Sequence, residues 1–226
     1  RMAGYVCGDG AKKHQILSGA VLSAGAGRIV DAVFADESVV LSMLTQFTSP
    51  RCRLEGLTLD LLCKVLTSLL APLQSHVRAA PPHAQEFDIV KKTPGFVDGL
   101  LGYLDSYSVC DYIIALLKLD VFHPNSGSIR WFCDNGFVTK LLQVFLEPEL
   151  SLDRIESVAR IINEIVIWRH THQIGASANI LADFFNIDKN LDGFIRVVFS
   201  TVCPPLLTRS PSATSRSTAS SSSPTS

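Results

Sequence analysis

The chain has 226 residues, of which 47% are hydrophobic and 18% charged, and its formal net charge is −1. A chain of this length forms one large domain or two small ones. The high apolar content excludes a wholly disordered acidic or basic binder. The balanced charge argues against a nucleic-acid-binding protein, which needs a concentrated basic face. The most apolar segment, residues 57–71, is too short to span a membrane and contains Asp60 and Lys64, so we expect no membrane insertion.

Six cysteines are spread along the chain, most of them in apolar surroundings. None belongs to a C-x-x-C pair, and no Cys/His spacing suits zinc. We therefore expect reduced, buried thiols, a cytoplasmic or nuclear location, and neither a metal nor another cofactor.

Apolar residues recur at helical spacing along most of the chain, and no period-2 run indicates a strand. The clearest stripes lie at 57–69, 96–104, 109–117, 137–145 and 155–166. Short breaks separate them, such as "TSPRC", "AAPPHA", "TPG", "FHPNSGS" and "EPELS". Pro94 is expected in a first helical turn. Ser151 is expected to be an N-cap, with Asp153 in the first turn that follows.

A succession of helices joined by short turns predicts an all-α protein. Short connections make neighbouring helices antiparallel, which favours an α-solenoid of degenerate HEAT- or armadillo-like helical hairpins. We recognise no clean sequence period. A compact helical bundle is the alternative.

The C-terminus differs in composition, because residues 208–226 are almost entirely Ser, Thr, Pro, Ala and Arg. Such a segment buries too little apolar surface to offset the entropy lost on ordering. We therefore predict a flexible segment at 1–13, a helical domain at 14–207 and a disordered tail at 208–226.

The segment "DKNLDGFIRVVF" (188–199) begins like an EF-hand calcium loop, with Asp188, Asn190, Asp192 and Gly193 at loop positions 1, 3, 5 and 6. Position 12, however, is Phe199, which offers no oxygen. We therefore predict a turn and helix cap with no bound metal. A calcium-responsive protein remains a minor alternative.

No arrangement typical of an enzyme is found. The sequence lacks a G-x-S-x-G motif, a phosphate-binding loop, H-E-x-x-H and a paired set of carboxylates. His170 and His172 are two residues apart and would point to different faces of a helix. We expect no catalytic, cofactor or metal residues.

Five segments, in order, resemble the SAPS domain of the regulatory subunits of protein phosphatase 6. The first segment is "TPGFVDGLLGYLDSYSVCDYIIALLKLD" (93–120). The family's P-x-F-V-x-x-L-L opening is matched by Pro94, Phe96, Val97, Leu100 and Leu101, and Asp111 falls on the family's aspartate. Tyr103 replaces the family histidine. The other segments are "ADESVVLSMLTQF", "DLLCKVLTSLL", "IRWFCDNGFVTKLLQVF" and "NILADFFNIDKNLDGFIRVVF". The family's H-S-N-A-S-x-x-L motif is reduced to "RIESVARII" (154–162), and its F-W-K-F-like opening is absent, as expected of a fragment of a divergent member.

The resemblance implies a non-catalytic scaffold that binds a serine/threonine protein phosphatase catalytic subunit and directs it to substrates. On this view Asp111, Trp131, Arg154 and Glu164 are the candidate partner-binding residues, although a packing role is the alternative for Trp131. An α-solenoid adaptor for an unrelated protein complex is the alternative function.

Overall fold

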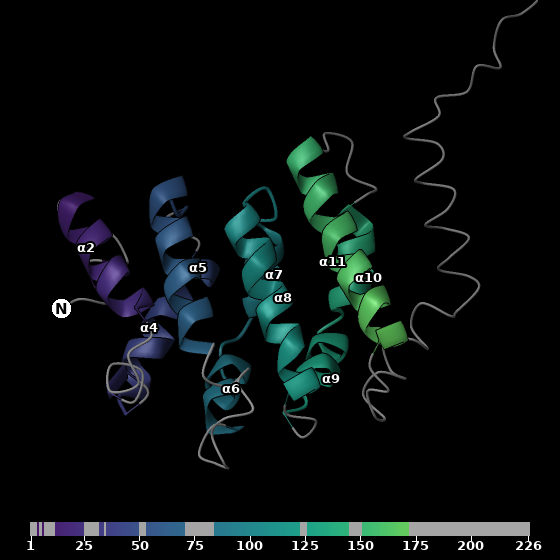
Figure 1. Cartoon of the computed structure of the whole chain (residues 1–226), viewed down its shortest axis with the longest axis horizontal. Helices are drawn as coiled ribbons and strands as arrows, with labels where there is room; N and C mark the ends of the chain where they lie inside the picture. The colour runs from purple at the N-terminus through teal and green to yellow at the C-terminus, as the bar shows by residue number, and fades with distance from the viewer. Residues whose placement is uncertain are drawn as a thin grey trace, which may run out of the picture.

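The computed structural model describes residues 12–24, 35–49, 53–70, 84–122, 126–144 and 151–171, together with Gly4, Val6, Ala32 and Val33. The regular structure within these ranges is helical, which confirms the predicted all-α class (Figure 1). The principal helices are α2 (Lys12–Ser23), α4 (Glu37–Thr48), α5 (Gly56–Leu70), α6 (Ala84–Lys91), α7 (Phe96–Leu101), α8 (Tyr107–Phe122), α9 (Ser128–Asp134), α10 (Phe137–Val144) and α11 (Leu152–Thr171). None of these helices is both long enough and apolar enough to cross a membrane.

The helices form two rows that run along the long axis of the molecule. Helices α2, α5, α8 and α11 pack side by side in that order, as Figure 1 shows. Helices α4, α7 and α10 form the second row and pack in that order. The short helix α6 contacts α4, and α9 contacts α8 and α10. Neighbours within a row therefore come from segments far apart in the sequence.

The helix order reveals a repeat that the sequence analysis did not recognise. Helices α6, α7 and α8 form one unit, and α9, α10 and α11 form the next. The middle helix of each unit begins with the motif G-F-V-x-x-L-L, at Gly95–Leu101 and Gly136–Leu142. Gly95 and Gly136 both have φ = 69°, a left-handed conformation that favours glycine. The same turn therefore sets the direction of α7 and α10.

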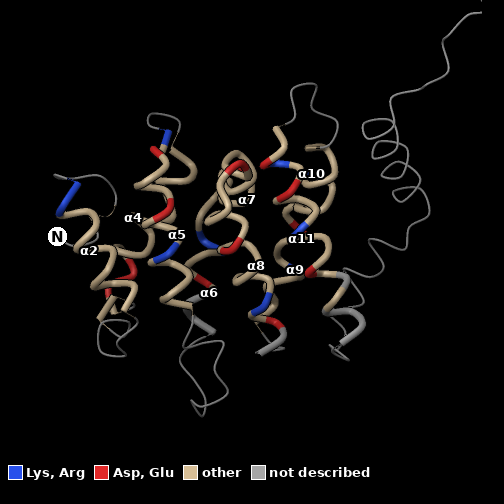
Figure 2. Tube along the Cα trace, turned by 45° about the horizontal axis from the view of Figure 1, so that its top comes forward, with Lys and Arg blue, Asp and Glu red and all other residues tan. Residues whose placement is uncertain are grey.

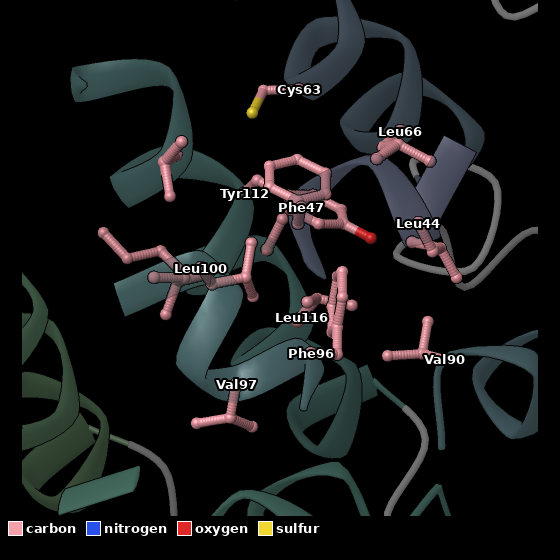
Figure 3. Packing of buried hydrophobic residues seen from close by; sticks show 14 of the residues in the cluster. Leu44, Phe47, Cys63, Leu66, Val90, Phe96, Val97, Leu100, Tyr112 and Leu116 are labelled. Atoms are coloured by element: carbon pink, nitrogen blue, oxygen red, sulfur yellow. The ribbon is translucent and has the colours of Figure 1, made fainter. Parts of the chain in front are cut away.

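Aromatic rings tie the two rows together in the centre of the core (Figure 3). The Phe47 ring from α4 lies 5.7 Å from the Phe96 ring of α7 and 6.4 Å from the Tyr112 ring of α8, measured between centroids. The Tyr103 ring lies 6.2 Å from Phe47, and its hydroxyl accepts a hydrogen bond from the Leu54 backbone N–H (3.1 Å). Tyr103 thus ties the start of α5 to the end of α7.

Polar side chains fix several helix ends. The Ser151 hydroxyl accepts from the Arg154 N–H (3.2 Å), which confirms the predicted N-cap of α11. The carboxylate of Asp120, fully buried in α8, accepts from the backbone N–H groups of Ser128 (3.2 Å) and Ile129 (2.7 Å). Asp120 therefore satisfies the start of α9 from the preceding unit, a role comparable to that of a cap.

Several details differ from the sequence prediction. Pro94 lies in the turn before Gly95 and not in the first turn of α7. The apolar spacing did not predict α6 and α9, because these helices carry fewer large apolar residues at helical spacing than α7 and α10, which are as short. The predicted boundary at residue 14 falls inside α2, which begins at Lys12. The calcium-like segment at 188–199 and the Ser-rich tail lie outside the described residues.

Candidate partner-binding surface

A pocket of about 360 Å³ lies between α5 and α8, two neighbours in the row formed by α2, α5, α8 and α11. Leu57, Leu61 and Cys63 supply apolar atoms to its lining. Its remaining lining residues share a polar side chain that can hydrogen-bond to a ligand: Asp60, Lys64, Thr67, Ser68, Ser108 and Asp111. The α5–α8 pocket therefore combines an apolar wall with polar groups.

The polar side of the pocket arises from the spacing of residues on α5. Asp60, Lys64 and Ser68 are four residues apart and therefore lie on one face of an otherwise apolar helix. The Asp60 carboxylate accepts a hydrogen bond from the Ser106 hydroxyl, which precedes α8 (3.3 Å). Figure 2 shows charged positions of both signs along the described helices. The pocket thus presents a carboxylate and an ammonium group from one helix face.

Asp111, one of the predicted partner-binding residues, lines this pocket from α8. Its Oδ1 atom lies 2.6 Å from Nη2 of Arg160 on α11, and both side chains are about one-third to two-fifths exposed. The same guanidinium lies 4.1 Å from the centre of the Tyr107 ring. An ion pair this exposed contributes on the order of 0–1 kcal/mol to stability. It mainly orients the Asp111 carboxylate toward α11.

Arg154 and Glu164, two further predicted residues, hold α11 against the preceding unit. Arg154 Nη2 donates to the carbonyl oxygen of Leu101 at the end of α7 (3.2 Å). Glu164 Oε2 lies 3.4 Å from Lys118 Nζ on α8. Asp111, Arg154 and Glu164 therefore all lie along the contacts of α11 with α7 and α8.

Trp131, the fourth predicted residue, lies elsewhere, where α9 meets α6. Its half-buried ring packs edge-on against Phe87 at 5.6 Å and Phe132 at 5.1 Å, measured between ring centroids. These contacts correspond to the packing role considered as its alternative. Three of the four predicted residues thus lie at separate points along the contacts of α11, and the fourth lies elsewhere.

The lining of the α5–α8 pocket includes one thiol, Cys63. Burial, and then the negative charges of Asp60 and Asp111, raise the pKa of the Cys63 thiol. A thiol that stays protonated is a poor nucleophile. Among the described residues, no cluster of three His, Cys, Asp or Glu side chains could hold a metal ion. The groups that remain are hydrogen-bonding and charged side chains beside an apolar wall.

Alkaline pH is expected to destabilise the protein through its buried thiols. Burial raises the pKa of Cys110 to about 11, despite the nearby Arg160 guanidinium, and burial also raises that of Cys63. The unfolded chain therefore loses these protons first. The stabilisation is complete below the ordinary thiol pKa and is lost as the pH rises toward the folded values. Urea unfolding at pH 7.5 and pH 10 should differ by about 1 kcal/mol per thiol.

The variant Cys110→Ala provides the control for this prediction. It should show a smaller loss of stability between the two pH values than the unchanged chain. An identical loss in both proteins would contradict the assignment to Cys110.

The sequence analysis missed Asp60, Lys64 and Ser108 as members of a site. Asp60 and Lys64 were considered only as charges that argue against a membrane span and as part of the segment "DLLCKVLTSLL" (60–70). A usable signal was present, because polar residues at four-residue spacing mark one face of an apolar helix. The position of that face beside α8 depends on tertiary packing.

The chain matches no family model, no curated protein and no solved structure.

Proposed function

We propose that this chain is a non-catalytic α-solenoid scaffold that binds a serine/threonine protein phosphatase catalytic subunit, of the protein phosphatase 6 type, and directs it to substrates. The observation that carries the proposal is the succession of two units with the same motif at the start of the same helix. Stacked units of this kind offer an extended surface that needs little ordering when a partner binds. We place this activity in the cytoplasm or nucleus, where free thiols such as Cys63 and Cys110 persist.

The arrangement of the rows supports a solenoid over a compact bundle. The strongest contacts of α5 are with α2 and α8, and α8 in turn packs against α11. A bundle would gather its first and last helices around one core. In Figure 1, α2 and α11 lie at opposite ends of the row.

The phosphatase as partner is supported by the SAPS-like segments. Four of them fall on α4, α5, α7–α8 and α9–α10, so the resemblance follows the helices of both rows. The family aspartate corresponds to Asp111, which lines the α5–α8 pocket. A pocket with an apolar wall and polar groups can receive an anchoring side chain of a partner. We therefore assign the contact surface to this pocket and the adjoining face of α11.

A charge exchange within α5 tests both the partner and the surface. The double variant Asp60→Lys with Lys64→Asp reverses two pocket charges four residues apart and keeps the net charge. Binding of the purified phosphatase 6 catalytic subunit, measured by calorimetry at near-physiological salt, should weaken at least about tenfold. The matched control is Arg130→Asp with Asp134→Arg, which reverses an exposed pair of the same spacing on α9.

Two outcomes would revise the proposal. If the unchanged chain does not bind the catalytic subunit, the phosphatase function is wrong, and an adaptor for an unrelated complex becomes the better interpretation. If binding persists equally in both double variants, the contact surface lies away from the pocket while the phosphatase function stands.

A further inference from the structure

A third copy of the repeated motif occurs in the sequence beyond the described helices. The two described copies read G-F-V-D-G-L-L (95–101) and G-F-V-T-K-L-L (136–142), and residues 193–199 read G-F-I-R-V-V-F. Each copy has glycine, phenylalanine and a β-branched residue, then two variable positions and two large apolar residues. In the described copies this order begins the middle helix of a unit. The sequence therefore carries this order of residues three times.

The last described helix of the row has an apolar side that faces away from its neighbour. Ser157, Arg160 and Glu164 of α11 lie toward α8, where the Ser157 carbonyl accepts from Cys110 Sγ (3.5 Å) and the other two form ion pairs. At 100° per residue, Ile155 and Ile162 lie on the opposite side of α11. Both are only half-buried. We call this side, with the neighbouring apolar residues of α10 and α11, the terminal apolar face: Leu142, Leu152, Ile155, Ala159 and Ile162.

Equivalent positions of the two described motif copies differ in burial. Leu101 ends the first copy and is 6% exposed, because the following unit covers it and Arg154 reaches its carbonyl. Leu142 ends the second copy and is only half-buried. Leu152, at the start of α11, is 82% exposed. The second unit therefore buries the end of the first motif copy, whereas the end of the second copy is only partly buried.

We propose that the terminal apolar face is the docking surface for Gly193–Phe199 of this same chain, which adds a further unit to the rows. The connecting segment is long enough for this docking. The segment between Thr171 and Gly193 is longer than the one between Phe122 and Gly136, which leads from α8 to the motif of the second unit. In this arrangement the calcium-like segment (188–199) has a role, because it contains Gly193, the glycine that begins the motif. The proposal does not depend on which partner the scaffold binds.

Replacing Phe194 in the full chain tests the proposal. Phe194→Ala should lower Tm by about 10 °C, because it removes the large apolar side chain that is fully buried in both described copies, as Phe96 and Phe137. Amide hydrogen exchange in α11 should become at least about tenfold faster. The matched control is Arg196→Ala, because the equivalent residues Asp98 and Thr139 are exposed. This control should change neither quantity.

Other outcomes would overturn the proposal. One is an unchanged Tm and unchanged α11 exchange in Phe194→Ala. Another is a Tm that rises with protein concentration and loses this dependence in Ile155→Asp, since a second copy of the chain would then cover the face. A third is a calcium-dependent rise in Tm that Asp188→Ala abolishes.

If Phe194→Ala does not fold, the milder pair Val198→Ala and Ile155→Ala is used. Their effects on Tm should be non-additive if the two side chains touch, and additivity would contradict docking.

Discussion

Replacing Phe47 with alanine is expected to lower the free energy of unfolding by about 4 kcal/mol, the range for removing a buried phenylalanine ring. Phe47 is 4% exposed, and its ring contacts three aromatic rings: Phe96, Tyr103 and Tyr112. These rings come from α7, α8 and the turn between them, so the substitution leaves a cavity where α4 meets the next unit. Urea unfolding followed by circular dichroism measures the change.

Leu17→Ala provides the control for this prediction, since Leu17 is 63% exposed on α2. Its effect should stay within about 0.5 kcal/mol. A loss below about 1 kcal/mol for Phe47→Ala would contradict the central position assigned to this ring.

Replacing Gly99 with alanine is expected to cost about 3 kcal/mol, the upper part of the range for overpacking. A Cβ atom at Gly99 would lie 2.6 Å from the carbonyl oxygen of Phe47 and 2.9 Å from its carbonyl carbon. Because these are backbone atoms, no side-chain rotation relieves the overlap, and α4 and α7 must move apart. Thermal unfolding should show a Tm lower by about 6–12 °C.

Gly56→Ala is the matched glycine substitution. A Cβ atom at Gly56, the first residue of α5, would meet no other atom within 4 Å. Because alanine favours helix over glycine, this variant should be neutral or more stable by up to about 1 kcal/mol. Equal losses in the two variants would show that Gly99 is not a close contact between helices.

Local patterns allowed several of the helices to be predicted. The apolar stripes at 57–69, 109–117 and 155–166 fall on α5, α8 and α11, because the long helices repeat their apolar spacing over several turns. The N-cap at Ser151 was also predictable, since a cap depends only on residues within one turn of it. Helices α6 and α9 were not predicted from their spacing, because each shows one pair of large apolar residues three positions apart, Phe87 with Val90 and Ile129 with Phe132.

The candidate site was predictable only in part. Asp111 and Glu164 stand out in sequence as carboxylates within apolar helices. Their partners Arg160 and Lys118 could not be identified, because an ion pair between helices depends on which faces meet. The α5–α8 pocket could not be predicted for the same reason, because its lining comes from two segments about fifty residues apart.

The sequence by itself determined the all-α class and the positions of α5, α8 and α11, because periodicity, capping and turn chemistry act within a few residues. Only the tertiary structure decided which helices are neighbours, and hence the two rows, the α5–α8 pocket and the close approach of Gly99 to Phe47. The structure also showed that the motif repeats, because Gly95 and Gly136 make the same left-handed turn in successive units. The physical reason is that packing between helices depends on the complementarity of faces far apart in the chain, which no local pattern encodes.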